Sequence, residues 1–324
     1  MRLSSLAALP AAAVLAMLPG AAHGLAHDAR EPAVRPVPVA APAPGPLAGL
    51  LPPVPLSAGL LPPVPRPPVP LPPVPLPSGP RPDDALPEYR YTGPGFDACS
   101  APSLDAMSVW WTASPYGAVN IYSSGGQRAC TQSRLTPQWV AQVRAMGWQL
   151  VPTHVGLQAP CAARPDKPLR IDPERAEEQG GEEAAEAAQA LQTLGLGPGS
   201  PVYLDMEAYP SGDAVCSRAV VDFTAGWTRA LQDAGYRSGF YSSMDSGIAD
   251  VVAAARAGRS PLPDAIWYAR WDGKATTTGQ AGLPDDLWTG HRIHQYRGGV
   301  NETYGGMTLS IDRDQVDGLV AGGS

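Results

Sequence analysis

Charged side chains are scarce in this chain of 324 residues: Asp, Glu, Lys and Arg together make up 16 % of it, and the formal net charge is −7. The chain also has no long basic run. Proteins that bind nucleic acids need clustered Lys and Arg side chains to displace counterions from the phosphates. The composition therefore excludes a nucleic-acid binder, and we expect no nucleic-acid partner.

Several motifs of other functional classes are also missing. There is no G-x-S-x-G sequence, which disfavours a serine hydrolase, and the segment GLGPGS at 195–200 lacks the Lys-Ser/Thr ending of a phosphate-binding loop. The 4 cysteines include no C-x-x-C pair, so their spacing does not suit a zinc site. The histidines His154, His291 and His294 are too widely spaced for a metal triad. We expect these histidines to be structural, and we predict neither a metal nor a cofactor.

Proline, in contrast, is abundant in one region, because 22 of the 39 prolines lie between Glu31 and Arg90. The middle of this region is a degenerate L-P-P-V-P repeat. Proline fixes φ and removes the amide donor, so neither a helix nor a sheet can form there. We predict that residues 25–90 are a disordered, proline-rich linker of polyproline II type, which is either a stalk or a passive spacer.

The first 24 residues have the layout of a secretory signal peptide. Arg2 precedes an apolar stretch from Leu6 to Leu18, and small residues follow up to Gly24. The apolar stretch is shorter than the roughly 20 residues of a membrane span. We therefore expect a cleaved signal peptide at 1–24, a secreted protein associated with the cell envelope, and no transmembrane segment in the mature chain.

Residues 91–320 contain all 4 cysteines and all 8 tryptophans, and we expect them to form the folded domain. Eight apolar, β-rich segments recur in it, at 93–99, 118–124, 148–156, 201–209, 236–243, 265–271, 292–296 and 307–312. Helical patterns separate most of them; one begins at Thr136-Pro137, a good N-cap pair. This alternation predicts an α/β fold, a (β/α)8 TIM-type barrel with a parallel sheet. Because the last connections are short, we expect the final helices to be reduced or missing.

Each of the four cysteines follows one of the first four predicted strands. They are Cys99, Cys130, Cys161 and Cys216. An even number of cysteines in an exported chain indicates disulfides, for which the sequence allows three pairings. Neighbouring strands of a barrel lie about 4.8 Å apart. We therefore expect Cys99–Cys130 and Cys161–Cys216.

The acidic residues at the strand ends are the candidate catalytic groups. Asp205 and Glu207 are separated by one residue in PVYLDMEAY, so their side chains share the face of the strand that points into the barrel mouth. Asp97 ends the first strand and Asp312 ends the eighth, and these strands adjoin in a closed barrel. Like charges in a partly dry cleft raise one pKa and create a proton donor beside an ionised partner. Glycoside hydrolysis needs such a pair.

Aromatic residues near the strand ends suit a sugar-binding cleft. They are Tyr122, Tyr209, Tyr241, Trp271 and Tyr296. The alternative for each of them is a half-buried place in the core. Gln295 could donate a hydrogen bond to a sugar hydroxyl or to a carboxylate. Arg270 and Arg313 are the nearest candidate ion-pair partners for the carboxylates.

The motifs GFDAC, LDMEAY, GFYSS, IWYARW, HQY and SIDRD follow one another in this order along the chain. In this order they resemble the strand motifs of family 25 glycoside hydrolases, the Chalaropsis-type lysozymes. The sequence is still more similar to exported actinobacterial glycoside-hydrolase-like domains, through GFDAC-x-AP, GG-x-x-x-C, GLQAPC and D-M-E-A-Y. The resemblance implies a barrel that acts on, or binds, cell-wall glycans.

The same resemblance implies roles for the four carboxylates. Glu207 would be the general acid, and Asp205 would orient or stabilise the 2-acetamido group of the substrate. Asp97 and Asp312 would shape the charge around the reacting sugar. We thus expect a monomeric, secreted enzyme that hydrolyses peptidoglycan or a related cell-envelope glycan by carboxylate acid/base catalysis. The alternative is a catalytically silent glycan-binding or envelope-organising domain, which carboxylates locked in salt bridges would favour.

Overall fold

The computed structural model describes residues 86–322. The predicted signal peptide at 1–24 and nearly all of the predicted linker at 25–90 therefore lie outside the described residues. Within the described range, no helix combines the length and the apolar character that crossing a membrane requires.

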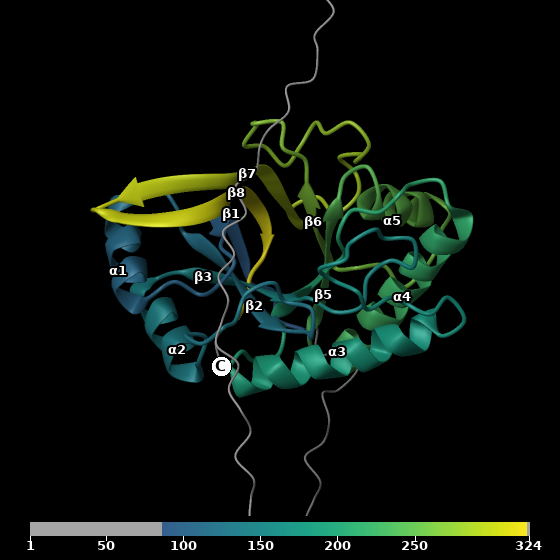
Figure 1. The fold of residues 1–324 in the computed structure, drawn as a ribbon, viewed down its shortest axis with the longest axis horizontal. Helices are drawn as coiled ribbons and strands as arrows, with labels where there is room; N and C mark the ends of the chain where they lie inside the picture. Colours follow the sequence, from purple (N-terminus) through teal and green to yellow (C-terminus); the bar gives the residue numbers. More distant parts are fainter. Residues whose placement is uncertain (1–85, 323–324) are drawn as a thin grey trace, which may run out of the picture. The chain divides into compact units, whose positions relative to one another are not determined.

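Eight strands form a closed barrel in the order of the sequence, which confirms the predicted fold class (Figure 1). The strands are β1 (Arg90–Asp97), β2 (Ala118–Ser124), β3 (Gln149–His154), β4 (Pro201–Asp205), β5 (Arg237–Ser243), β6 (Ala265–Ala269), β7 (Arg292–Tyr304) and β8 (Met307–Leu319). Strands β1 to β7 run parallel to one another. The carboxyl ends of seven strands thus meet at one end of the barrel.

In the described residues, five helices surround the barrel, and each of them connects two consecutive strands. They are α1 (Leu104–Ala113), α2 (Pro137–Met146), α3 (Ala176–Thr193), α4 (Ala214–Asp233) and α5 (Gly247–Arg256). The predicted cap of α2 is present, because the side chain of Thr136 accepts a hydrogen bond from the amide of Trp139. Within 86–322, no helix follows β6 or β7, which agrees with the expected loss of the final helices. The reason differs for β6, because a long loop at 270–291 and not a short connection joins it to β7.

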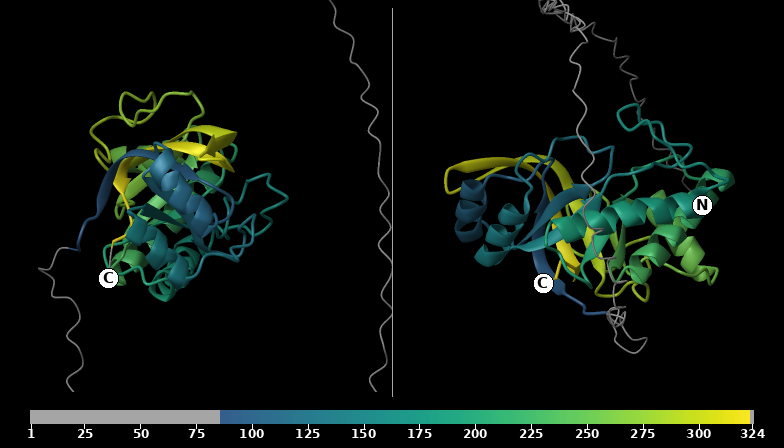
Figure 2. Two further views of the ribbon diagram at one scale, coloured as in Figure 1. Left: turned by 90° about the vertical axis from the view of Figure 1, so that its left-hand side faces the viewer. Right: turned by 90° about the horizontal axis from the view of Figure 1, so that it is seen from below.

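The last two strands correct one expectation. The sequence predicted a wholly parallel sheet with a short eighth strand at 307–312, but β8 is antiparallel to both β7 and β1. A tight turn at Gly305-Gly306, both with positive φ, joins β7 and β8 into a long hairpin that extends beside α1 (Figures 1 and 2). Asp312 therefore lies within β8 rather than at its end, and it reaches the barrel mouth from the middle of the strand.

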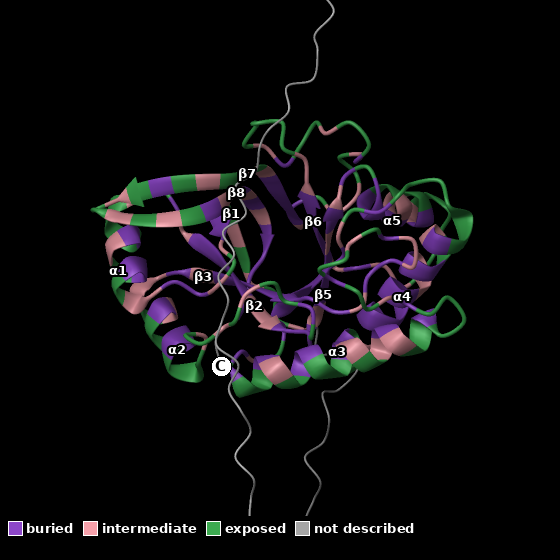
Figure 3. Ribbon diagram, viewed as in Figure 1, coloured by how far each residue is buried: buried purple, intermediate pink, exposed green. Residues whose placement is uncertain are grey.

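Burial follows the layers of the barrel (Figure 3). Alternate residues of β4, Val202 and Leu204, pack outward against the helices, together with Trp227 of α4. Tyr203 points inward, into an apolar layer at the bottom of the barrel that includes Trp267. Because side chains alternate along a strand, Asp205 lies on the same inner face as Tyr203, one layer higher. The alternation thus places the Asp205 carboxylate in the mouth, above an apolar floor.

Two disulfides fasten the loops at the barrel mouth. Cys99 pairs with Cys130 and Cys161 pairs with Cys216, with Cα–Cα distances of 5.6 and 5.9 Å. This is the pairing that the strand order predicted. The second disulfide ties the loop after β3 to the first turn of α4, and it thereby constrains a loop that enters the candidate site.

Candidate active site

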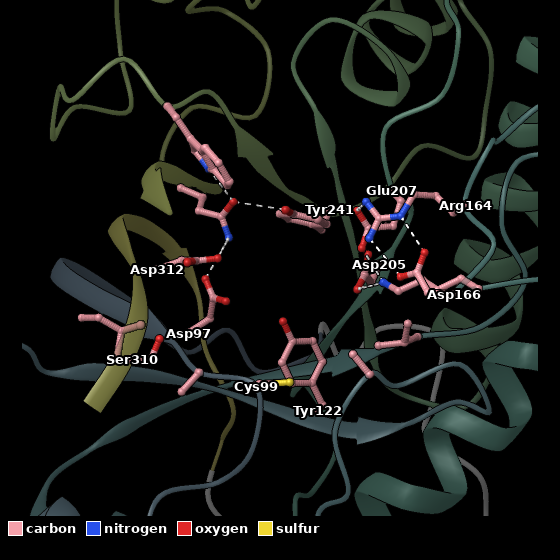
Figure 4. Close-up of a pocket in the computed structure, with 17 residues that line it drawn as sticks. Asp97, Cys99, Tyr122, Arg164, Asp166, Asp205, Glu207, Tyr241, Ser310 and Asp312 are labelled. Atoms are coloured by element: carbon pink, nitrogen blue, oxygen red, sulfur yellow. Dashed lines mark hydrogen bonds and ion pairs between the residues drawn. The ribbon is translucent and has the colours of Figure 1, made fainter. Parts of the chain in front are cut away.

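A pocket of about 410 Å³ opens at the carboxyl ends of the strands (Figure 4). Eight of the ten predicted catalytic and sugar-binding residues line it: Asp97, Tyr122, Asp205, Glu207, Tyr241, Trp271, Gln295 and Asp312. Asp97 and Asp312 lie on one side of the pocket and Asp205 and Glu207 on the other, with Tyr241 between them. Two walls of carboxyl groups therefore face one hollow.

The wall formed by Asp205 and Glu207 is positioned by the backbone at the end of β4. The buried side chain of Gln158 accepts a hydrogen bond from the Glu207 amide at 2.9 Å and donates one to the Asp205 carbonyl, also at 2.9 Å. These two hydrogen bonds fix the backbone at residues 205–207, where β4 ends. Both carboxylates consequently point to the same side, as their spacing of two predicted.

Two cations from the loop after β3 neutralise this wall. Lys167 Nζ lies 3.3 Å from Asp205 Oδ2 and also contacts Glu207 Oε1. Arg164 Nη1 lies 3.2 Å from Glu207 Oε2, and the other side of its guanidinium pairs with Asp166. The two carboxylates of the D-x-E motif are thus held in ion pairs.

The prediction that Arg270 and Arg313 are the ion-pair partners of the cleft carboxylates was wrong. Arg270 pairs with Asp245, and Arg313 pairs with Glu302 on the hairpin. The sequence could not reveal the actual partner Lys167, because the loop that carries it folds back over the mouth. One signal was available: the chain contains only two lysines, Lys167 and Lys274.

We call residues 159–170 the cation loop. Arg170 stabilises the conformation of this loop by hydrogen bonds inside it. Its guanidinium donates to the carbonyl oxygens of Ala162 and Arg164, each at 2.9 Å, and to that of Lys167. Cys161 anchors its start to α4. The Lys167 side chain is only 6 % exposed. The loop therefore presents Lys167 as a fixed, buried cation.

Removing the Cys161–Cys216 disulfide, as Cys161→Ser/Cys216→Ser, should loosen this loop. The bond spans 55 residues, so its loss should lower the free energy of unfolding by about 3–4 kcal/mol. We also expect Lys167 to become reactive towards an acylating reagent, with exposed Lys274 as the internal standard, read by peptide mass spectrometry. The matched control is Cys99→Ser/Cys130→Ser, which should leave Lys167 protected. Equal protection of Lys167 in both variants would show that the disulfide does not hold the loop.

The ionisation of Asp205 reflects its surroundings. Burial raises its pKa to about 6; the cation of Lys167 opposes this shift, and the charge of Glu207 adds to it. Burial disfavours the charged form of Lys167, but the two carboxylates outweigh burial and its pKa is raised. Asp205 therefore keeps its proton to a higher pH than a solvent-exposed aspartate does.

Among the Lys, Arg and His side chains at 86–322, none forms an ion pair with the carboxyl groups of the opposite wall. Asp97 and Asp312 occupy paired positions of the β1–β8 ladder, and Gln295 Nε2 donates to Asp97 Oδ2 at 2.9 Å and to Asp312 Oδ2 at 3.4 Å. Burial, followed by the charge of Asp312, raises the pKa of Asp97 well above its usual range. Burial likewise raises the pKa of Asp312, against a hydrogen bond from the Gly299 amide. This wall therefore favours protonated carboxyl groups.

Sequence reasoning missed a third aspartate, Asp314, beneath this wall. It is two residues beyond Asp312 and so faces the same side of β8, where it is 3 % exposed. Trp267 Nε1 donates to its Oδ1 at 3.0 Å. The alternation D-x-D in SIDRD, read in the same way as D-x-E in LDMEAY, was the signal for it.

Trp271 and Tyr241 are joined to the aspartate wall by Gln295. The Gln295 Oε1 atom accepts hydrogen bonds from Tyr241 at 3.2 Å and from Trp271 Nε1 at 3.0 Å. Trp271 is 66 % exposed and borders a second hollow of about 400 Å³ that shares Glu207, Tyr241 and Gln295 with the first. The cleft thus continues past Glu207, which lies where the two hollows meet.

The structure does not bring two predicted sugar-binding residues to the cleft. Tyr209 is buried and donates to Asp250 of α5 at 2.6 Å. It lies beyond the end of β4, where strand alternation no longer applies. Tyr296 follows the inward-facing Gln295 and therefore points to the other face of β7, next to His294.

The three histidines make contacts outside the pocket. His154 is buried between Ser124 and Glu183, His291 contacts the Asp264 carbonyl at 2.8 Å, and His294 lies between the carbonyl oxygens of Thr276 and Arg270. Across the part of the chain that the structure describes, no three His, Cys, Asp or Glu side chains are grouped so that they could hold a metal ion.

The chain is similar to a known protein family and to several solved structures. Residues 109–316 match the family described as Rv2525c-like, glycoside hydrolase-like domain. Similar solved structures include an uncharacterized protein of B. stearothermophilus (16 % identity, 70 % of this chain and 99 % of that chain, TM-score 0.48). A second is the catalytic domain of endolysin ply40 from bacteriophage P40 of Listeria monocytogenes (17 % identity, 69 % of this chain and 93 % of that chain, TM-score 0.39). A third is a muramidase from Acremonium alcalophilum (18 % identity, 69 % of this chain and 93 % of that chain, TM-score 0.40). None of the curated proteins compared with the chain matches it. Since the family match covers the greater part of the chain, this protein belongs to the Rv2525c-like, glycoside hydrolase-like domain family.

Proposed function

We propose that this protein is a secreted glycoside hydrolase that cleaves peptidoglycan or a related cell-envelope glycan. The observation that carries the proposal is the cleft with two carboxyl walls in different electrostatic environments, one neutralised by cations and one without them. Environments that separate the pKa values of neighbouring carboxyl groups provide the acid and the ionised partner of glycoside hydrolysis. The two disulfides suit an oxidising compartment outside the cytoplasm.

In this proposal Glu207 delivers the proton, because it lies where the two hollows meet and so faces a bond between two sugar residues. Substrate that displaces Arg164, whose side chain is 40 % exposed, releases Glu207 Oε2 from its ion pair, so that this oxygen can face the leaving oxygen. Asp205 Oδ1 is buried and has no hydrogen-bond partner among the described residues. It can accept the N–H of a 2-acetamido group once the side chains that cover it move aside on substrate binding.

A catalytically silent glycan-binding domain is the second candidate. The ion pairs of Lys167 and Arg164 favour it, because they stabilise the charged forms of Asp205 and Glu207 and oppose proton donation. The two candidates share the same cleft and the same glycan. They differ in whether a bond is broken.

The deciding experiment is a mass-spectrometric analysis of soluble fragments released from purified peptidoglycan. It compares the full chain with Asp205→Asn/Glu207→Gln. The proposal expects fragments with new reducing ends from the wild type alone. If neither protein releases fragments and both sediment with the glycan, the binding domain replaces the hydrolase for this substrate.

Trp271 should provide a stacking surface for a sugar ring. Its indole packs over Gly298, where an added Cβ would lie 2.3 Å from the ring, and most of the ring remains exposed beside both hollows. We expect Trp271→Ala to weaken glycan binding about tenfold, or about 1.4 kcal/mol, measured by calorimetry with soluble glycan fragments. The control is Trp111→Ala, an exposed tryptophan of α1 outside the cleft. Equal affinities of the wild type and Trp271→Ala would contradict this role.

A further inference from the structure

Asp314 lies where the pocket floor meets the apolar bottom layer of the barrel. Its neighbours below are apolar, among them Ile293 and Val316. Above it, Asp314 lies on the same face of β8 as Asp312, the ladder partner of Asp97, and it is therefore a diagonal neighbour of Asp97 across the β1–β8 ladder. Asp97 and Asp314 are thus two buried acidic groups side by side.

No cation compensates them within residues 86–322. The ion pairs of the described Lys, Arg and His side chains do not include Asp97, Asp312 or Asp314, and the intervening Arg313 turns away to Glu302. Two neighbouring ionised carboxylates, both removed from water, would repel each other without compensation. The pair therefore retains a proton.

The surroundings assign this proton to Asp314. Asp97 borders the pocket and accepts a hydrogen bond from Gln295 Nε2. The orientation of that amide is determined, because its Oε1 accepts from Tyr241 and Trp271. In the described part of the chain, Asp314 has only the Trp267 indole as a donor and lies against apolar side chains, so its charged form is the less stable one.

The directions of the pKa shifts agree with a retained proton. Burial raises the pKa of both groups well above their usual range; the charge of Asp97 raises that of Asp314 further, and the charges of Asp312 and Asp205 raise that of Asp97. The hydrogen bond from Gln295 lowers the pKa of Asp97, and the hydrogen bond from Trp267 lowers that of Asp314. The other titratable groups that interact with the pair are Asp312 of β8, Asp205 of β4, Tyr122 of β2, Tyr241 of β5 and Tyr296 of β7.

We propose that Asp314 keeps a proton at neutral pH and is a positioning residue of the cleft. Its role in sugar binding rests on the proposed function. The protonated carboxyl donates to Asp97, which keeps Asp97 oriented as the acceptor of Gln295. Gln295 in turn holds Trp271 and Tyr241. A single buried proton thus supports the sugar-binding wall from below.

The test compares Asp314→Asn, which retains a donor, with Asp314→Leu, which removes it. The first readout does not depend on activity: the side-chain carboxyl ¹³C signals of aspartate-labelled protein are followed from pH 4 to 9. We expect one aspartate signal in the wild type to remain in the protonated position at pH 7 and to be lost in Asp314→Asn. Asp317→Asn, on the same strand but paired with Arg90 at the surface, should retain that signal.

The second readout is fragment release. Asp314→Asn should keep kcat/KM within about threefold of the wild type, whereas Asp314→Leu should lower it at least tenfold, mainly through KM, because Trp271 loses its support. Absence of a protonated aspartate at pH 7 would overturn the proposal, as would equal impairment of both variants. The ¹³C signals show whether Asp314 is protonated even if the wild type releases no fragments. Failure of the proposed hydrolase function can therefore be distinguished from failure of the proposal for Asp314.

Discussion

Replacing Glu207 by glutamine should lower the rate of fragment release about 10³-fold, while glycan binding stays within about threefold. A positioned general acid contributes roughly 10²- to 10⁴-fold to catalysis. Glutamine keeps the shape of the side chain and can still accept hydrogen bonds from Lys167 and Arg164, but it has no proton to deliver to the leaving oxygen. The measurement is kcat for new reducing ends from soluble glycan fragments, together with calorimetric binding of the same fragments.

The control for charge loss is Glu178→Gln, on the exposed face of α3 away from the cleft. It should release fragments at the wild-type rate. If Glu207→Gln lowered release only twofold to threefold, Glu207 would not be the general acid. If binding fell in parallel with turnover, Glu207 would hold the substrate rather than protonate it.

Lys167→Met should lower the free energy of unfolding by about 3 kcal/mol at pH 7. The Lys167 and Asp205 side chains are 6 % and 7 % exposed, so the variant leaves a buried carboxylate without its cation. Removal of one partner of a buried ion pair costs about 3–5 kcal/mol, because the remaining charge is uncompensated. Methionine fills a similar volume, so the loss reports the charge rather than a cavity. Urea unfolding measures it.

The loss should also depend on pH. The folded-state pKa of Asp205, about 6, lies above its value in the unfolded chain, so unfolding releases a proton between those two values and stability falls as the pH rises through that window. Without Lys167, which lowers this pKa, the decline should continue beyond pH 6. The deficit of Lys167→Met relative to the wild type should therefore be smaller at pH 5 than at pH 8.

Lys274→Met is the matched control, since Lys274 is the only other lysine and is exposed in the loop between β6 and β7. It should change stability by less than about 0.5 kcal/mol at either pH. Equal deficits of Lys167→Met at pH 5 and pH 8 would show that Lys167 does not control the ionisation of Asp205.

The sequence was sufficient for the features that depend on local periodicity. Strand and helix patterns alternate along the chain, and this alternation predicts the barrel because each amphipathic segment must bury one face. Asp205 ends β4, so strand alternation places its carboxylate in the mouth. Glu207, two residues further on, keeps the same side because Gln158 holds the backbone beyond the strand. Asp97 and Asp312 could be paired because the first and last strands of a closed barrel adjoin.

The sequence failed where position depends on how irregular segments fold. It predicted a parallel β8, because a short strand does not reveal its direction without the turn at Gly305-Gly306 that pairs it with β7. It placed Tyr209 in the cleft by extending strand alternation beyond the end of β4. It nominated Arg270 and Arg313 as partners of the carboxylates because they lie near strand ends.

The sequence by itself thus determined the barrel and the carboxylates of the two walls, since these follow from the repeat of side chains along each strand. Only the tertiary structure decided how each wall is neutralised. Lys167 reaches Asp205 and Glu207 through a loop whose course depends on the Cys161–Cys216 disulfide and on Arg170, contacts that no local pattern records. The proton proposed for Asp314 likewise depends on burial and on the absence of a nearby cation, both of which are properties of the packed barrel rather than of any segment.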